Sequence, residues 1–429
     1  MNIMRGIQRF GRWVMVATLA AGGLPGVGLA ADASLDERVR ALEKKLDLEQ
    51  KSNATEHTTV KERVDAIEKD VKDAQQTISD KLGFEMHGFV AGSYLYNFNE
   101  PKSQTNTLRV FDTDANTFTL DQANINILRK KDEGLGYSVN LDFGKAAEIV
   151  GGATRWSNNA ANTESHNSIE LREAYLTYKL KLGDGITFKA GKFVTLLGAE
   201  VISNFDNQNA NISRSISFGF GIPFTHTGLL ASFPIGSMVN IDAGVVNGWD
   251  AVADNNEVKT FLGGLGVTPA DVFAMYLSGT YGPEQNNRSG SKRGVLTDVF
   301  TIKPADMLTL IAEVTYGHET KLLGPSLDDG ADWYGGCGYV IVKATDDLSF
   351  ALRGEVFDDT DGTRFGLPGG PKVTSWEITP TVSYQIATGL LLRAEYRHDE
   401  ADKPIFENSD GNFLRKGQDT IATQLVYAF

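Results

Sequence analysis

The sequence is poor in cysteine, in positive charge and in continuous apolar segments. Cys337 is the single cysteine among 429 residues, which excludes a disulfide-stapled scaffold and any zinc or iron–sulfur site built from several cysteines. The 41 Lys and Arg are outnumbered by 55 Asp and Glu, and the formal net charge is −14. Proteins that bind nucleic acids need basic surfaces to neutralise phosphates, so a nucleic-acid partner is excluded as well.

No segment approaches the ~18 continuous apolar residues that a membrane-spanning helix needs. The longest run, residues 13–24, follows several arginines and precedes the small residues Gly28 and Ala30. A basic start, a short apolar run and small residues at a cleavage point are typical of a secretory signal peptide. A helical membrane anchor is the alternative. The pattern predicts that residues 1–30 are an export signal.

The next segment, residues 31–82, contains no glycine, proline or aromatic residue. Its apolar residues recur at alternating intervals of four and three, in two blocks whose phase changes near residues 51–59: Leu35, Val39, Leu42 and Leu46, then Val60, Val64, Ile67, Val71, Ala74 and Ile78. Such a repeat is typical of a coiled coil. We therefore expect a coiled-coil segment that joins several copies of the chain; a solvated helix lying against the rest of the chain is the alternative.

From Phe84 onward the apolar spacing changes to two. The alternating segments are residues 84–98, 137–143, 173–182, 308–316, 348–357, 376–384 and 390–397. In an exported protein, strands with one apolar and one polar face indicate a membrane β-barrel, because open sheet edges cannot exist in hydrocarbon. A soluble sandwich also alternates, but its apolar faces would consist chiefly of Val, Ile, Leu and Phe. Here they often end in Tyr, Trp or Phe, as the aromatic girdles of a membrane interface do.

The C-terminal strand adds a sharper signal. Ile421, Thr423, Leu425, Tyr427 and Phe429 share one of its faces. An exported chain that ends on an aromatic residue in this way resembles outer-membrane barrels, whose assembly machinery reads that end. The sequence therefore predicts Tyr427 and Phe429 as an assembly signal, and outer-membrane lipid and the barrel assembly machinery as partners.

The length of residues 83–429 sets the size of the barrel. At about 9–11 residues per spanning strand, with turns and loops of similar total length, the segment gives about 16 strands, with 14 or 18 as alternatives. Short turns are expected at residues 182–185, 267–271, 302–306 and 387–389, and long outer loops near residues 99–117, 145–168, 283–293, 319–331 and 399–417. A barrel of this width can hold water, so we expect a diffusion pore.

Charged residues on the face opposite the lipid are the candidates for selectivity. They are Glu173, Lys179, Lys181, Lys189, Arg353, Glu355, Arg393, Glu395 and Arg397. Two arrangements remain open: a transverse field between a basic and an acidic wall, or simple pairing between neighbouring strands. The Asn-rich residues 198–215, which contain Arg214, either fold into the lumen and form a constriction or remain an ordinary surface loop.

The sequence gives no support for catalysis. The histidines are scattered without metal-ligand spacing, and neither a G-x-S-x-G elbow nor a phosphate loop occurs. Residues 358–362 resemble a calcium loop, but the acids do not alternate as that loop requires. We therefore expect no enzyme activity, no cofactor and no metal.

Short segments across the barrel region resemble a known family. They are residues 116–123, 173–178, 190–193, 198–200, 213–215, 226–228, 246–250 and 352–359. Together they resemble the outer-membrane β-barrel porins of the OmpL-like type. The resemblance implies a channel in the outer membrane of a Gram-negative cell, but it supplies no substrate.

Similar helical stalks precede trimeric porins, so the resemblance also implies a homo-trimer, with the N-terminal segment in the periplasm. The expected function is passive diffusion of ions and small hydrophilic solutes. An envelope-tethering, adhesin-like barrel and a porin sleeve around a partner protein are the alternatives.

Overall fold

The computed structural model describes residues 83–130, 132–153, 168–203, 209–320, 330–367 and 370–429, with a few isolated residues between 44 and 73. The predicted signal, residues 1–30, lies outside the described residues, and so does the predicted coiled coil of residues 31–82 apart from those isolated positions. No helix in the described ranges is long and apolar enough to cross a membrane.

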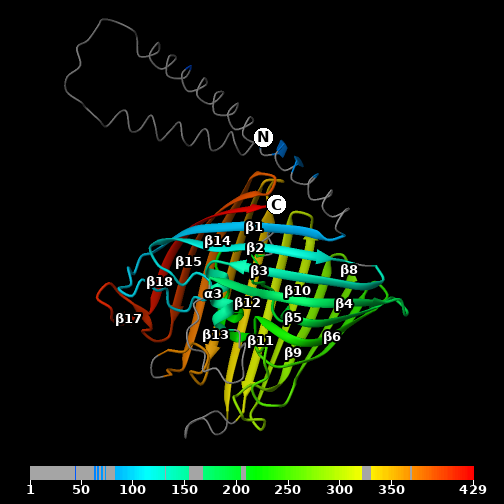
Figure 1. Ribbon diagram of the computed structural model, residues 1–429. Coiled ribbons are helices and arrows are strands. Elements are labelled where there is room, and N and C mark those ends of the chain that lie inside the picture. The colour runs from blue at the N-terminus through cyan, green and yellow to red at the C-terminus, as the bar shows by residue number, and fades with distance from the viewer. Residues whose placement is uncertain are drawn as a thin grey trace, which may run out of the picture. The chain divides into compact units, whose positions relative to one another are not determined.

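Sixteen antiparallel strands close into one barrel (Figure 1). The strands are β1 (Glu85–Asn97), β2 (Thr117–Arg129), β3 (Gly134–Phe143), β4 (Ile169–Leu180), β5 (Ile186–Val194), β6 (Thr225–Ile235), β7 (Val239–Val246), β8 (Thr260–Ala270), β9 (Phe273–Pro283), β10 (Lys292–Ala305), β11 (Leu308–Glu319), β12 (Ala331–Lys343), β13 (Leu348–Asp359), β14 (Val373–Ala387), β15 (Leu390–Ala401) and β18 (Gly417–Ala428). The last strand closes the barrel by pairing with the first, with Tyr427 opposite Val90. The predicted barrel class and strand number are confirmed.

Smaller elements lie in the loops. The helix α3 (Lys145–Ala153) follows β3, and a single π-helical turn, η2 (Ser217–Gly221), lies between β5 and β6. The short strands β16 (Phe406–Glu407) and β17 (Phe413–Arg415) pair with each other in the loop before β18.

Tight turns gather at one end of the barrel, here called the turn end, and long segments at the other, the loop end. Two predicted turns are wrong in position, since β8 and β10 continue to Ala270 and Ala305. Both strands lose regular register beside a proline, at Pro269 and Pro304. Proline has no N–H group to donate to the hydrogen-bond ladder of a sheet and is tolerated at such irregularities. Each of these prolines therefore indicates where regular strand pairing ends, not where the turn lies.

The outward face of the barrel is apolar, as the alternation predicts. On β13, Leu352 and Val356 are exposed, whereas Arg353 and Glu355 between them are buried. Aromatic side chains border this face, including Tyr316 and Tyr334, which stack with ring centroids 5.3 Å apart. Exposed apolar side chains in a closed barrel are what a lipid-facing surface requires.

The interior is not polar throughout, and this part of the sequence expectation is wrong. Buried apolar side chains of the strands and of the loop segments form one cluster inside the loop half of the barrel; they include Leu108, Val150, Phe193, Phe218, Phe224, Leu230, Trp333, Phe357, Phe365 and Phe406. Most of the strand members lie near the loop ends of their strands, and the described loop segments fold inward to cover them. Burying these rings stabilises the folded loops and narrows the loop end of the barrel.

Candidate functional site in the barrel interior

The described residues between β5 and β6, 195–203 and 209–224, lie inside the barrel and are called the inward loop. Its backbone and side chains bond to several strands: the Ala199 N–H donates to Glu313 Oε2 at 2.8 Å, and Asn211 Nδ2 donates to Thr381 Oγ1 at 2.7 Å. Trp333 Nε1 donates to the carbonyl of Gly221 at 3.0 Å. Of the segment 198–215, the described residues 198–203 and 209–215 therefore lie in the lumen rather than on the surface; residues 204–208 lie outside the described residues.

Two buried glutamates of the wall each bind a pair of consecutive backbone amides in the inward loop. Glu355 on β13 accepts hydrogen bonds from the N–H groups of residues 216–217 at 2.5 and 2.6 Å. Glu395 on β15 does the same for residues 212–213 at 2.6 and 2.9 Å. A carboxylate that accepts backbone N–H groups makes a charge-assisted bond, about twice as strong as a neutral one.

Buried arginines of the same wall bind the loop's carbonyl groups. Arg353 Nη1 donates to Ser213 O at 2.8 Å. Arg393 Nη1 donates to Asn211 O at 3.3 Å, and Arg397 Nη1 to the carbonyl of residue 214 at 2.6 Å. Arginine and glutamate alternate along β13 and β15. The arginines donate to carbonyl groups of the loop backbone, and the glutamates accept from its N–H groups.

These five charged residues were expected to face an open lumen. The structure instead brings them together against the inward loop, and each is almost fully buried. Pairing between neighbouring strands describes part of the arrangement, because Arg353 Nε on β13 donates to Glu377 Oε1 on β14 at 2.6 Å. The loop contacts could not be read from the sequence, since their partners are backbone groups without a side-chain signature.

Arg214 belongs to the inward loop itself and holds its two limbs together. Its guanidinium donates to the carbonyls of Val201, Ile202 and Ile212 at distances from 2.8 to 3.1 Å. Its Cζ also lies 5.6 Å from the centre of the Phe111 ring. Burial lowers the pKa of Arg214, and the three carbonyl contacts compensate part of the cost of burying its charge.

The remaining predicted residues lie on the opposite side of the barrel. Glu173 accepts a hydrogen bond from Asn140 at 2.8 Å, and Lys189 Nζ lies 4.5 Å from the centre of the Tyr175 ring. This is the geometry of a cation–π contact. Lys179 lies on the inward row of β4 near the turn end, where it is partly buried.

Lys181 requires a correction of its position. The alternation extended the strand to residue 182, but β4 ends at Leu180. Lys181 therefore lies in the turn, where its Nζ is 2.7 Å from Glu133 Oε2 and both side chains are exposed. An exposed ion pair in a turn contributes little to the barrel wall.

Sequence reasoning missed several residues of the interior. Glu200 and Glu377 flank Arg353, and Arg109 of the first loop donates to Asp399 Oδ2 at 2.8 Å. Asp250 closes the end of the inward loop. The inward rows of the strands did contain one usable signal, since apolar residues such as Phe357 interrupt their polar pattern near the loop end.

Asp250 holds the point where the inward loop enters β6. Its Oδ1 accepts the backbone N–H groups of Phe224 and Thr225, both at 2.8 Å. Burial raises the pKa of Asp250 to about 7, although these two hydrogen bonds act in the opposite direction. The carboxyl group therefore titrates near neutral pH.

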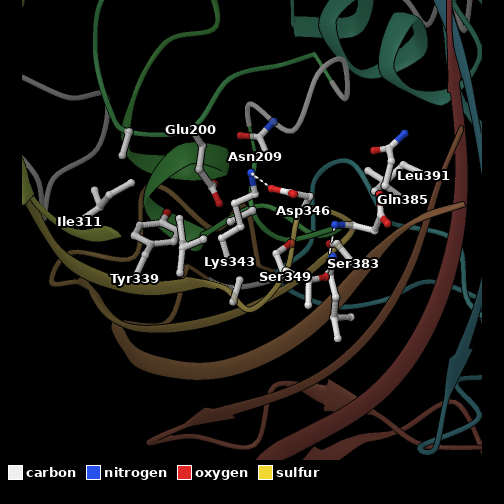
Figure 2. Close-up of a pocket in the computed structure, with 17 residues that line it drawn as sticks. Glu200, Asn209, Ile311, Tyr339, Lys343, Asp346, Ser349, Ser383, Gln385 and Leu391 are labelled. Atoms are coloured by element: carbon white, nitrogen blue, oxygen red, sulfur yellow. Dashed lines mark hydrogen bonds and ion pairs between the residues drawn. The ribbon is translucent and has the colours of Figure 1, made fainter. Parts of the chain in front are cut away.

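Two cavities lined by both polar and apolar side chains lie on the turn side of the inward loop. One holds about 260 Å³; Figure 2 shows Glu200 and Asn209 of the loop on one side of it and Tyr339, Lys343 and Ser383 of the wall on the other. The second holds about 420 Å³ and is lined by side chains of β1–β4 and by residues 201–203. Within the described ranges, no group of three or more His, Cys, Asp or Glu could hold a metal ion.

Comparison with known proteins agrees with this architecture. Residues 83–429 match the family model described as "Putative beta-barrel porin-2, OmpL-like". No curated protein matches the sequence.

Several solved structures share the fold. OprB of Pseudomonas putida is 11% identical, with a TM-score of 0.56 over 84% of this chain and 97% of OprB. An anion-selective porin from Comamonas acidovorans is 9% identical, with a TM-score of 0.52 over 81% of this chain and 99% of that porin. OmpT of Vibrio cholerae is 13% identical, with a TM-score of 0.52 over 81% of this chain and 97% of OmpT.

At these identities the solved structures show the fold alone. The family model, in contrast, runs from Gly83 to the C-terminal Phe429 and so covers the whole barrel. The resemblance seen in the short sequence segments is confirmed. The chain therefore belongs to the OmpL-like family of β-barrel porins and is an outer-membrane porin channel.

Proposed function

We propose that this channel passes ions and small hydrophilic solutes down their concentration gradients. The observation that carries the proposal is that the inward loop forms most of its hydrogen bonds to one wall of the barrel. The wall of β10–β15 holds the loop, and cavities of about 260 and 420 Å³ remain on its turn side. Both have polar as well as apolar side chains in their walls, among them Glu200, Asn209 and Arg172. Such polar groups suit hydrated solutes, and the apolar cluster at the loop end supports a limit to small ones.

The proposed orientation puts the turn end in the periplasm and the loop end outside the cell, because short turns of bacterial barrels face the periplasm. Residues 31–82 would then form a periplasmic coiled coil that gathers three copies of the chain. One structure of OmpT, with a TM-score of 0.50 to this chain, is described as a trimer form, which supports an oligomer.

The position of the C-terminus supports the proposed assembly signal. The Phe429 N–H donates to Gly88 O at 2.9 Å, and the Gly88 N–H donates to Phe429 O at 3.0 Å. The last residue therefore completes the seam between β18 and β1. In the proposed role, the assembly machinery binds Tyr427 and Phe429 before this seam closes.

Planar-bilayer recording of the purified full-length protein tests the channel. We expect discrete conductance steps, and we expect them also from a variant without residues 31–82, whose oligomer should be weaker. A folded protein that produces no steps at any voltage would overturn the proposal.

A further inference from the structure

A third interior space lies where β18, β1 and β2 meet the interior segments, next to β15 of the wall that holds the inward loop. It is called the acidic gap and holds about 30 Å³, room for about one water molecule. Its polar lining comes from the wall, from residues 112–114 of the first loop, from Lys145 at the start of α3 and from Arg214 of the inward loop.

Oxygen atoms with unmet bonding capacity face this gap. Asp121 on β2 accepts hydrogen bonds from Ser93 Oγ and from Gln424 Nε2, both at 2.7 Å. The amide of Gln424 is thereby oriented, and its Oε1 has no hydrogen-bond partner in the part of the chain that the structure describes. The same holds for Asp112 Oδ1. Gln424 is only 2% exposed, and a buried oxygen without a partner costs about 1–3 kcal/mol.

The cationic groups around the gap are already engaged. Lys145 Nζ lies 2.9 Å from Asp114 Oδ2 and 3.2 Å from a carboxylate oxygen of Glu148. Arg214 donates to the three carbonyls described above. Basic side chains are thus directed to protein acceptors, whereas the atoms still lacking partners are oxygens.

We propose that the acidic gap discriminates among the ions that the channel passes and that it favours monovalent cations. Asp112 Oδ1, the Asp121 carboxylate and Gln424 Oε1 would replace part of the water shell of a passing cation, as oxygen-lined filters do. The gap is a transit position rather than a retaining site, because a single amide oxygen and shared carboxylates hold an ion weakly. This inference rests on the proposed channel function.

The reversal potential of the full-length protein in a KCl gradient tests it. We expect the wild-type protein to prefer K⁺ over Cl⁻, and Asp112→Asn and Asp121→Asn each to lower the permeability ratio several-fold. Gln424→Glu adds a charge at the same place and should raise the ratio. Asp298→Asn is the matched control, because Asp298 faces outward on β10, and it should leave the ratio unchanged.

The outcomes separate the two proposals. A wild-type protein without conductance overturns the channel function itself. Conducting channels that prefer Cl⁻, or whose ratio is the same in the wild type and in every folded variant of the gap, overturn the selective role of the acidic gap and leave the channel standing. Gln424→Glu keeps the test decisive if loss of the Asp121 charge prevents folding.

Discussion

Arg353 on β13 and Glu200 in the inward loop form a buried ion pair, with Nη1 2.9 Å from Oε1, across 153 residues of sequence. The same guanidinium binds Glu377 through Nε. One arginine therefore links the loop to two neighbouring strands, and the position of the loop in the lumen depends on it.

Replacing Arg353 by alanine should destabilise the barrel and free the loop. Glu200 and Glu377 would remain buried without their cation, and breaking a buried pair in this way costs about 3–5 kcal/mol. We expect a lower unfolding temperature in detergent and a larger, noisier single-channel conductance. Lys181→Ala is the control, because its exposed ion pair with Glu133 contributes little. An Arg353→Ala protein as stable and as quiet as the wild type would contradict the anchoring role.

The two glutamates that bind the loop backbone should act together. In the double variant Glu355→Ala/Glu395→Ala, four backbone amides of residues 212–217 lose their acceptors. Each orphaned amide costs about 1–3 kcal/mol unless water reaches it, so the loop is expected to leave the wall. Conductance should rise well above that of the corresponding double Gln variant, which keeps one acceptor oxygen per side chain. Equal conductance of the two double variants would show that these carboxylates do not hold the loop.

Strand positions were readable from the sequence because alternation is a local property. The segments predicted to begin at residues 308, 348 and 390 begin there in the structure, as β11, β13 and β15. Each follows a tight turn in the structure. Only the turn at residues 387–389, before β15, was also predicted in place, so the period of the apolar residues was the more reliable signal.

The roles of the interior charges were not readable, because their partners are distant or lack a side-chain pattern. Glu355 and Glu395 alternate with apolar residues as pore-lining charges would, but they bind backbone amides. Arg109 reaches Asp399 across 290 residues. The one sequence feature that indicated a packed rather than open loop half is that apolar residues, such as Phe357, replace polar ones among the inward-facing residues of the strands.

Asp250 should make stability depend on pH between about 4 and about 7. Its folded-state pKa of about 7 exceeds the unfolded value of about 3.9, so the folded protein binds this proton more tightly. The resulting stability is fully present below about pH 4 and is lost as the pH rises through about 7. Asp250→Asn keeps an acceptor for the N–H groups of Phe224 and Thr225 but cannot titrate.

The unfolding temperatures of the wild type and of Asp250→Asn are measured in detergent from pH 4 to pH 8. The difference between the two curves gives the contribution of the Asp250 carboxyl group. We expect the wild type to lose stability relative to the variant as the pH rises. Asp254→Asn should differ from the wild type by a constant amount over this range, because neighbouring Lys259 helps to lower the pKa of Asp254 and its contribution changes only below about pH 4. Parallel curves for the wild type and Asp250→Asn would contradict the assignment.

The C-terminal aromatic residue should matter more for assembly than for stability. The Phe429 ring is partly exposed, so Phe429→Ala should leave the unfolding temperature of refolded protein nearly unchanged. In cells, the amount of folded barrel in the outer membrane should fall several-fold, since the proposed signal is lost. Phe413→Ala, which removes an exposed ring from β17, is the matched control. Normal membrane levels of Phe429→Ala would exclude the ring as the signal.

Asp298 is an acid on the lipid-facing surface, and replacing it should stabilise the barrel. It lies in the middle of β10, between Leu277 and Val314 of the neighbouring strands, and its Oδ1 has no hydrogen-bond partner among the described residues. Charged groups on this face of a barrel are destabilising, acids less so than bases. Asp298→Leu should therefore raise the free energy of unfolding in lipid vesicles by about 1 kcal/mol.

Urea unfolding in vesicles measures this change, and Thr297→Val serves as the internal comparison. The Thr297 hydroxyl faces inward and accepts a hydrogen bond from the Gly198 N–H at 3.2 Å, so its loss should lower stability where Asp298→Leu raises it. A lower stability of Asp298→Leu together with loss of the oligomer would mean that this carboxyl is covered by a second copy of the chain rather than by lipid, since only a protein partner can satisfy it within the membrane.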